Sequence, residues 1–552
     1  MPRRRILLGV LLLSTSACAP RRADLVITGG MVWTGLASGE AQPGAVAIAG
    51  DRILAVGDSA RIARYVGART QVVSAAGGLV LPGFADGHTH FTSGGLQLRS
   101  VDLRTSASPQ EFVRRIADYA RGLKPGQWIT GGDWDHELWP GAPLPRREWI
   151  DSVTPDNPVF VYRLDGHMAL ANGAALRAAG VTRDTPEPPG GVIVRDPRTG
   201  EPTGILKDNA EGLVDRVIPD PSPEELDSAL VRALAHAASL GVTATAHMSA
   251  SWDDLASYRR IRNAGRLTVR VALYLPLTGW RVVADSVQRG GRGDDWIRIG
   301  GVKGYADGSL GSSTALLFAP YRDAPTTSGL LRAPEESLRA WIGAADSAGL
   351  QVAVHAIGDR ANAVILSIYD SLVRVHGARD RRFRIEHAQH LRPEDVPKFG
   401  ALQVVASMQP PHLIDDGQWA EKRLGPERVR TSYVFRTLLD TNAPLAFGSD
   451  WSVAPLDPLV GVSAAVMRWT RDGKNPGGWL PEQKVTLAEA LRAYTAGNAF
   501  ATFNEQRWGV LAPGYLADVV VLDENLFALA PDSRNRGRVR YTIVGGKVVY
   551  GR

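Results

Sequence analysis

The hydrophobic positions at the two ends of the chain form short, strand-like runs. Each run is three to six residues long and is followed by a turn that contains glycine, aspartate or a similar turn residue. The runs lie at 25–27, 31–33, 45–48 and 52–56 and again at 517–522, 541–544 and 547–550. Because neither end has enough strands for a stable sheet, we expect segments 24–80 and 508–552 to combine into one small β-sandwich.

Between these ends, from 81 to 507, apolar strand-length runs alternate with amphipathic helical stretches such as 334–348 and 360–376. The candidate strands are 79–81, 242–246, 269–273, 297–302, 351–354, 383–385, 403–405 and 445–447. Repeated strand–helix alternation indicates a parallel sheet, and eight strands favour a closed (β/α)8 TIM-like barrel in the α/β class. A doubly wound open sheet is the competing architecture, but no Gly-x-Gly-x-x-Gly motif follows an early strand.

One long segment, from about 109 to 227, interrupts this alternation. It is rich in proline, glycine and tryptophan, with Pro-Glu-Pro-Pro-Gly-Gly at its centre. Long insertions in barrels fall on the loop face, so we expect a lid over the site. Its tryptophans are more typical of packing than of a substrate cage.

The first 18 residues have the layout of an export signal. Three arginines precede an eight-residue apolar run, and small residues then lead to Cys18, the only cysteine of the chain. This order resembles the lipobox of bacterial lipoproteins, in which the cysteine carries the lipid. We therefore expect an exported protein of the cell envelope, lipid-anchored or periplasmic, that contacts a membrane only through Cys18.

Composition removes several classes of function. Of 552 residues, 44% are hydrophobic and 22% charged, which is ordinary globular usage and excludes wholesale disorder. The net charge of +6 comes from basic residues interleaved with acidic ones, so we expect no nucleic-acid binding. A single cysteine excludes an intrachain disulfide and a cysteine-based zinc site. Any metal must be held by His, Asp, Glu or Lys.

The strongest local signal for chemistry is His88-Thr-His90. Residues two apart on an extended segment point the same way, so both imidazoles can reach one metal at the end of the first barrel strand. A lone His-x-His is a weak signal, and further candidates at the ends of later strands strengthen it.

Those further candidates are Lys303, His355, His387 and Asp450, each directly or shortly after an apolar run. A lysine at a buried strand end needs a partner. Lys303 is either the ion-pair partner of Asp307 or an amine that adds carbon dioxide and bridges two metals as a carbamate. Singly, each residue could equally belong to the core, but together they mark the carboxyl ends of strands, where barrel enzymes build their sites.

Three more histidines are candidates for contact with substrate. His167, inside the insertion, is the first choice for a substrate contact or oxyanion donor, and the alternative is a loop-structuring role. His390 follows His387 by three residues and could contact substrate or orient a metal ligand. His247 ends a predicted strand and faces the pocket mouth by position. We expect the remaining histidines, 136, 236, 376 and 412, to be structural or exposed.

Together these residues resemble the amidohydrolase superfamily. Longer motifs are similar to its family 3 branch, which includes the N-substituted formamide deformylases. The motifs are 86–90, 165–167 with Asn172, 190–191, 303–315, 355–359, 386–390, 495–498 and 514–518. The similarity runs from about 24 to 549, virtually the whole chain after the export signal.

The resemblance implies a (β/α)8 barrel with a flanking β-sandwich and one or two divalent metals, usually zinc. By this resemblance, the ligands are His88 and His90 for the more buried metal, His355 and His387 for the more exposed one, a carbamylated Lys303 as the bridge, and Asp450. It also implies that Asp450 is catalytic; His167, from its own position in the insertion, is our second catalytic candidate.

The implied reaction is hydrolysis of a carbon–nitrogen bond in a small molecule, of the non-peptide amide, N-acyl or N-formyl type, through a metal-activated water. The same site could instead cleave an ester or lactone. A non-catalytic solute-binding protein of the envelope is the alternative from another class. The sequence leaves a homo-oligomer open.

Overall fold

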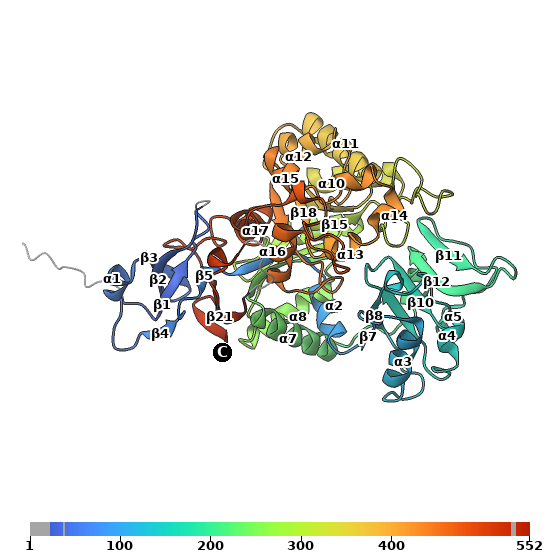
Figure 1. Ribbon diagram of the computed structural model, residues 1–552, viewed down its shortest axis with the longest axis horizontal. Helices are drawn as coiled ribbons and strands as arrows, with labels where there is room; N and C mark the ends of the chain where they lie inside the picture. The colour runs from blue at the N-terminus through green and yellow to red at the C-terminus, as the bar shows by residue number, and fades with distance from the viewer. Residues whose placement is uncertain (1–21, 37–38, 531–536) are drawn as a thin grey trace, which may run out of the picture.

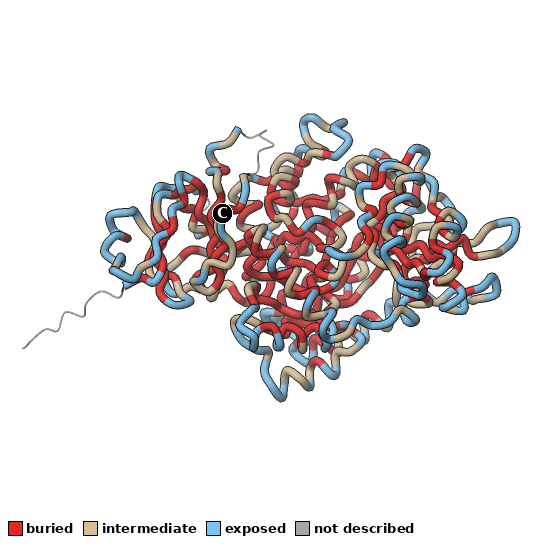
Figure 2. Tube along the Cα trace, turned by 90° about the horizontal axis from the view of Figure 1, so that it is seen from below, coloured by how far each residue is buried: buried red, intermediate tan, exposed pale blue. Residues whose placement is uncertain are grey.

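The computed structural model describes residues 22–36, 39–530 and 537–552. The predicted export signal at 1–18, with Cys18, lies outside the described residues. Three β-sheets organise the molecule, and Figure 1 shows them side by side: the sheet of the chain ends, the central barrel and the sheet of the insertion. Buried residues concentrate in the barrel, and exposed ones follow the periphery (Figure 2).

The central sheet has eight strands in the order β19-β18-β17-β16-β15-β14-β13-β6, and every neighbouring pair is parallel. The strands are β6 (Phe84–Thr89), β13 (Val242–Met248), β14 (Arg270–Pro276), β15 (Ile297–Tyr305), β16 (Gln351–Ala356), β17 (Arg384–His387), β18 (Val405–Met408) and β19 (Leu445–Phe447). This confirms the predicted (β/α)8 barrel.

The first barrel strand is not the one that the apolar pattern predicts. Segment 79–81 forms β5 (Leu79–Pro82), which pairs with β20 (Val519–Leu522) in the terminal sheet. The barrel begins at β6 (Phe84–Thr89), whose sequence Phe-Ala-Asp-Gly-His-Thr is fully buried yet half polar. A functional strand end carries polar side chains into the interior, so it lacks the apolar run by which buried strands are found.

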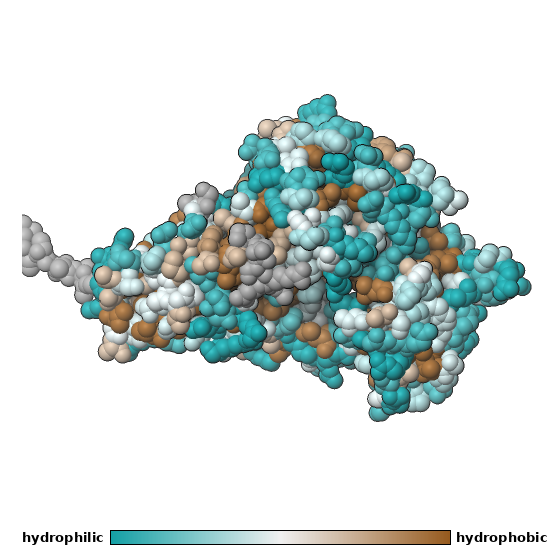
Figure 3. Space-filling view, viewed as in Figure 1, coloured by the Kyte–Doolittle hydropathy of each residue, from teal (hydrophilic) through white to brown (hydrophobic). Residues whose placement is uncertain are grey.

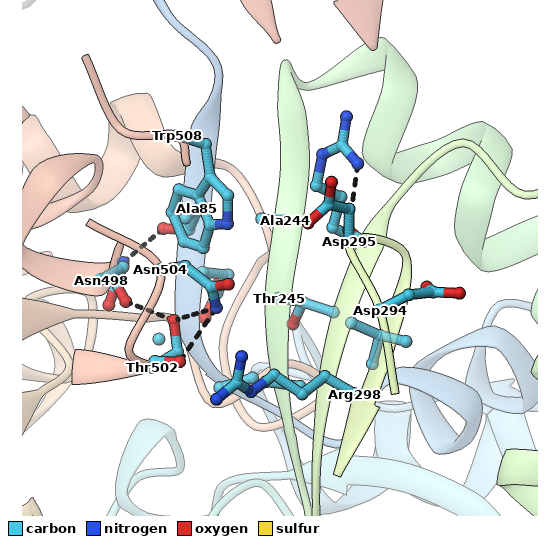
Figure 4. A pocket seen from close by; sticks show the side chains of 16 residues that line it. Ala85, Ala244, Thr245, Asp294, Asp295, Arg298, Asn498, Thr502, Asn504 and Trp508 are labelled. Atoms are coloured by element: carbon cyan, nitrogen blue, oxygen red, sulfur yellow. Dashed lines mark hydrogen bonds between the residues drawn. The ribbon is translucent and has the colours of Figure 1, made fainter. Parts of the chain in front are cut away.

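Asn498 closes the barrel between its first and last strands. It lies on α18 (Ala496–Ala501), and its side-chain amide donates hydrogen bonds to Ala85 O at 2.6 Å and to Phe447 O at 2.8 Å. Figure 4 shows the bond from Asn498 to Ala85 beside a cavity of about 20 Å³. That space suits one or two waters at most.

Helices cover the barrel. They are α7 (Pro223–Ser239), α8 (Trp252–Asn263), α9 (Trp280–Gly290), α10 (Glu335–Ser347), α11 (Asp359–His376), α12 (Val396–Leu402), α15 (Phe435–Asp440), α16 (Pro458–Met467) and α17 (Leu487–Ala493). In α7, residues 230, 233, 234 and 237 repeat at helical spacing and are buried, and Ser222 with Glu225 forms a capping box at its start. Their apolar faces join one large core with the barrel strands.

The insertion folds around its own six-stranded sheet, in the order β11-β12-β10-β9-β8-β7. The strands are β7 (Val101–Asp102), β8 (Gly131–Trp134), β9 (Phe160–Arg163), β10 (Met168–Ala171), β11 (Gly191–Arg195) and β12 (Pro202–Asp208). Trp134 and Trp139 stack at 6.3 Å between ring centroids and both contact Phe112 of α3 (Pro109–Ala120). These tryptophans pack the core of the insertion.

Strands from both chain ends share the third sheet. It contains β1 (Leu25–Val32), β2 (Gln42–Ala49), β3 (Arg52–Gly57), β4 (Gln71–Ser74), β5, β20, β21 (Val539–Val544) and β22 (Lys547–Gly551). Its core joins Ile27 and Ile48 from the first part of the chain with Val519 and Ile543 from the last part. Neither part could bury these side chains alone.

Among the described residues, every helix is too short or too polar to cross a bilayer. On the face seen in Figure 3, hydrophobic residues form scattered patches in a largely hydrophilic surface. Scattered apolar residues of this kind are normal on a protein surface.

Candidate metal centre

His88 in the first barrel strand and His90 directly after that strand converge on one carboxylate. The Nε2 atoms of both imidazoles lie 3.3 Å from Oδ1 of Asp450. The ligand atoms of these three side chains all lie within 4.8 Å of one another. The two-residue spacing on an extended strand therefore brings both histidines to one point, as the sequence predicts.

Asp450 lies in the loop after β19. Its backbone adopts φ of 59°, and its N–H donates to His88 O at 2.7 Å, which joins the two ends of the barrel sheet. Burial favours the neutral acid, but the neighbouring histidines outweigh burial and hold the pKa of Asp450 well below its usual range. Its Oδ1 is buried without a hydrogen-bond partner among the described residues. An ionised, buried oxygen among imidazole nitrogens fits a divalent cation.

A buried ion pair between Glu386 and Arg384 orients the ring of His88 through its Nδ1 side. Nδ1 of His88 donates to Oε2 of Glu386 at 2.7 Å, and Nε of Arg384 donates to the other oxygen, Oε1, at 2.7 Å. With Nδ1 hydrogen-bonded to Glu386, Nε2 is left for a metal, because a carboxylate behind a ligating histidine fixes which nitrogen faces the metal. Burial and then the charge of Lys303 lower the pKa of His88 to about 4, so the ring is neutral at pH 7.

Lys303 projects from β15 into this cluster. Its Nζ lies 3.3 Å from Nε2 of His88 and 4.7 Å from the centroid of the Tyr305 ring. Of the two interpretations of this lysine, the ion pair with Asp307 is not formed. Asp307 instead accepts the backbone N–H groups of Leu316, Ile357 and Gly358. Among the described residues, no carboxylate pairs with the Lys303 ammonium.

His355 and His387 form the other side of the cluster. Their ring centroids are 4.5 Å apart, and His387 lies 5.0 Å from His88. Nε2 of His355 donates to Gly308 O at 3.1 Å, which leaves Nδ1 for a cation. Nδ1 of His387 contacts Oε1 of Gln409 at 2.7 Å. Burial lowers the pKa of both histidines well below the usual range, so both are neutral, as metal binding requires.

Sequence reasoning missed His412. We expected it to be structural or exposed, but its ligand atom lies with those of His387 and Asp450 inside a second group within 4.8 Å. His412 follows β18 by four residues, so its position after the seventh strand was the available signal. The two prolines between strand and histidine conceal that position.

The insertion brings His167 to the same place. Its ring centroid lies 4.8 Å from that of His355, and its Nδ1 donates to Oδ1 of Asp208 at 2.7 Å. Asp208 ends β12 with φ of 50°. A non-glycine residue with positive φ at a site marks a conformation that the surrounding structure enforces.

The other two histidines predicted to contact substrate face protein instead. Nδ1 of His247 lies 3.3 Å from the hydroxyl of Tyr258, and Nδ1 of His390 lies 2.8 Å from Oγ of Ser432. Both side chains are buried, and neither lines the cavity above the candidate ligands. The geometry gives neither residue a direct contact with a molecule in that cavity.

Two spaces share lining residues at this cluster. A cavity of about 730 Å³ opens over His88, His90 and Lys303, and a chamber of about 50 Å³ lies beyond His355 and His387. The residues that line both are Arg163, Leu164, Asp165, His167, His355, His387, Asp450 and Val453. The candidate ligands therefore stand at the junction of a large and a small space.

A (β/α)8 barrel with neutral histidines and an ionised aspartate at the carboxyl ends of its strands, below a cavity, defines the class of metal-dependent hydrolases. The comparisons agree. A family model described as "Amidohydrolase family" matches residues 71–550, and the chain belongs to the amidohydrolase family. It is a hydrolase that acts on carbon–nitrogen bonds of small molecules.

Three similar proteins cover nearly the whole chain. Protein LONG AFTER FAR-RED 3 of Arabidopsis thaliana is 42% identical over 96% of this chain and 92% of its own length. The N-substituted formamide deformylase of Arthrobacter pascens is 26% identical over 92% of this chain and 95% of its own. The crystal structure of a metal-dependent hydrolase from Pyrococcus horikoshii OT3 superposes with a TM-score of 0.73 at 29% identity, covering 93% of this chain and 99% of that one.

Proposed function

We propose that this protein hydrolyses non-peptide amides in which a small acyl group, formyl or acetyl in size, is joined to a larger amine. One observation carries the proposal: Oδ1 of Asp450, buried and without a hydrogen-bond partner among the described residues, lies among imidazole nitrogens, and Asp450 lines both the small chamber and the large cavity. The chamber has room for on the order of three or four water-sized groups, which suits a short acyl group.

The residues offer places for one or two divalent cations, and nitrogen and oxygen donors favour zinc. His88, His90 and Asp450 would hold the first, and His387 with His355 or His412 the second. Lys303, without a carboxylate partner among the described residues, is the candidate for a bridging carbamate. A cation held here would acidify water and polarise the substrate carbonyl.

The chain's own side chains would then move the protons. Asp450 is ionised, so it accepts a proton from the attacking water and passes it to the leaving nitrogen. His167 faces the junction from the insertion; its Nδ1–H is held by Asp208, so a second proton, on Nε2, would make it the donor to the oxygen that gains negative charge. Glu386 keeps His88 in the orientation that binds metal.

For the location, the export signal at 1–18 supports a protein of the cell envelope, periplasmic or attached through a lipid on Cys18. Mass spectrometry of Cys18 in membrane and soluble fractions would distinguish these two forms.

The test of the reaction uses purified protein loaded with zinc and two matched pairs of probes. N-formylbenzylamine and N-acetylbenzylamine contain the amide bond. Benzyl formate and benzyl acetate have the same acyl and benzyl groups but contain an ester bond instead. Turnover of the amides that disappears in Asp450→Asn, with unchanged circular dichroism, supports the proposal. Turnover of the esters alone would replace it with the esterase alternative.

Two controls accompany this assay. Asp184→Asn, an exposed position of the insertion, should leave turnover unchanged. Elemental analysis and native mass spectrometry give the number of metals and the presence of a carbon dioxide adduct. A protein that binds no metal after zinc loading and cleaves no probe would favour a non-catalytic binding protein.

A further inference from the structure

Arg332 is held rigidly at the wall of the large cavity. Its backbone N–H donates to Ala306 O at 2.9 Å, and its side-chain Nε donates to Oδ1 of Asn209 at 3.0 Å. Asn209 also donates from Nδ2 to Arg332 O at 2.9 Å. The guanidinium carbon lies 4.8 Å from the centroid of the Tyr305 ring. These contacts fix the guanidinium through one nitrogen and leave its two terminal nitrogens for another partner.

The insertion builds part of this support. Gly190 packs against the backbone of Arg332 with φ of 75°, and a Cβ at that position would lie 2.8 Å from Arg332 O. Gly190 is therefore required by its close approach to the backbone of Arg332, and Gly191 by its close approach to the backbone of Asn209 and Ala210. The Gly-Gly motif thus supports both Arg332 and its partner Asn209.

Arg332 differs from Arg163, the other arginine held close to the candidate ligands, in its charge balance. Arg163, at the wall of the same cavity, pairs with Asp165, and Asp133, also at that wall, pairs with Arg104. In the part of the chain that the structure describes, no carboxylate oxygen lies within ion-pair distance of Arg332. A pre-oriented guanidinium without a carboxylate is the arrangement that binds an external anion through two parallel hydrogen bonds.

The position of Arg332 relates this anion to the reaction. The Tyr305 ring that it contacts lies 5.4 Å, between centroids, from the ring of His355. We propose that Arg332 binds a carboxylate on the amine portion of the substrate, so that the protein prefers N-acyl compounds that carry a negative charge. This inference rests on the proposed function. Asp133 and Asp215 line the same cavity and would disfavour a doubly charged group such as a phosphate.

The test compares acids with their uncharged amides. N-acetylglycine and N-acetylglycinamide differ only in the charged group, and the corresponding derivatives of β-alanine and 4-aminobutyrate vary its distance from the scissile bond. We expect wild-type kcat/KM to favour the best-fitting acid about 10- to 100-fold over its amide, the gain of a charge-assisted pair. Arg332→Gln should remove this preference through KM and leave the amide within about twofold.

Two variants make the result specific. Arg332→Lys keeps the charge but loses the planar fork, so it should restore only part of the preference. Arg99→Gln removes an exposed positive charge from the same cavity and should keep the preference. No preference in the wild type, or an equal preference in Arg332→Gln, would overturn the inference.

Binding separates this inference from the proposed reaction. If zinc-loaded protein cleaves none of the N-acyl probes, the proposed function fails, and calorimetry with the same intact compounds decides the subsite. Tighter binding of the acid, lost in Arg332→Gln, supports it, and equal binding of acid and amide overturns it. Binding of inorganic phosphate that depends on Arg332, without any preference for the acid, also overturns it.

Discussion

The Nδ1 atom of His167 and Oδ1 of Asp208 lie 2.7 Å apart, although 41 residues separate them in the chain. This hydrogen bond fixes the proton on Nδ1 and directs the other edge of the ring toward the junction of the two cavities. The second oxygen of Asp208 is buried without a hydrogen-bond partner among the described residues. The only side-chain hydrogen bond of this carboxylate among the described residues is therefore the one to His167.

Replacing Asp208 with Asn should lower kcat by about 10-fold or more, because the amide no longer fixes the proton of His167 on the buried nitrogen. KM should change little, since the imidazole remains in place. Steady-state kinetics on N-formylbenzylamine measures both constants. Asp196→Asn, at a surface turn of the insertion, is the matched control. Unchanged kcat in Asp208→Asn would show that His167 has no part in the reaction.

Replacing Glu386 with Gln should reduce both stability and metal affinity. It leaves the fully buried Arg384 without its charge partner, which costs about 3 kcal/mol in the free energy of unfolding. Zinc affinity should fall about 10- to 100-fold because His88 loses its orienting carboxylate. Urea unfolding and zinc titration with a chelator measure the two effects.

The control for this prediction is Glu148→Gln. Glu148 pairs with Arg146 on the surface, where removing the pair changes stability by less than about 1 kcal/mol. Equal losses in the two variants would contradict a special role for the buried pair.

Stability should fall on acidification partly through His390. Burial, followed by the charge of Arg428, lowers the pKa of His390 to about 3, whereas an unfolded histidine has a pKa of about 6.5. The unfolded chain therefore binds more protons below pH 6.5, and the contribution of this neutral ring is lost as pH falls from 6.5 toward 3. The slope per histidine approaches about 1.4 kcal/mol per pH unit.

Urea unfolding at pH 7.5, 6.0 and 5.0 measures this effect. His390→Asn keeps a polar group near Ser432 but removes the titration, so its stability should depend less steeply on pH than that of the wild type. Identical slopes would show that His390 is not a buried neutral group.

Replacing Asn498 with Ala should lower the free energy of unfolding, because Asn498 bridges the seam of the barrel, the junction between its first strand β6 and its last strand β19. The carbonyl oxygens of Ala85 and Phe447 would lose their buried donor, at about 1–3 kcal/mol for each unsatisfied group. The seam holds the strands that carry His88 and Asp450, so kcat should fall as well. Urea unfolding and kinetics test this, and lost stability with full activity would separate the seam from the site.

Much of this protein follows from local patterns in the sequence. Strand–helix alternation predicts the barrel, and the two-residue spacing of His88 and His90 predicts that their side chains converge. His355, His387 and Asp450 follow from their places at strand ends, because parallel strands bring their carboxyl ends to one rim. These inferences need only the period of a strand and the connectivity of a barrel.

Local patterns misplace other parts. The apolar run at 79–81 looks like a barrel strand, but the half-polar segment from Phe84 takes that place. His412 lies behind two prolines and was missed, while His247 and His390 occupy plausible positions yet face Tyr258 and Ser432. Which way a side chain at a strand end points depends on its neighbours in space.

The sequence alone determined the barrel, its family resemblance and most of the candidate ligands, because these depend on periodicity and on the order of motifs. Only the tertiary structure decided the partners: Asp208 for His167, Glu386 with Arg384 for His88, and Asn209 for Arg332. The contacts His167–Asp208, His88–Glu386 and Arg332–Asn209 join residues that are 41, 298 and 123 positions apart, so the tertiary packing sets their distances. Contacts between segments that are far apart in the chain produce no periodic pattern in a single sequence, so they cannot be predicted from it.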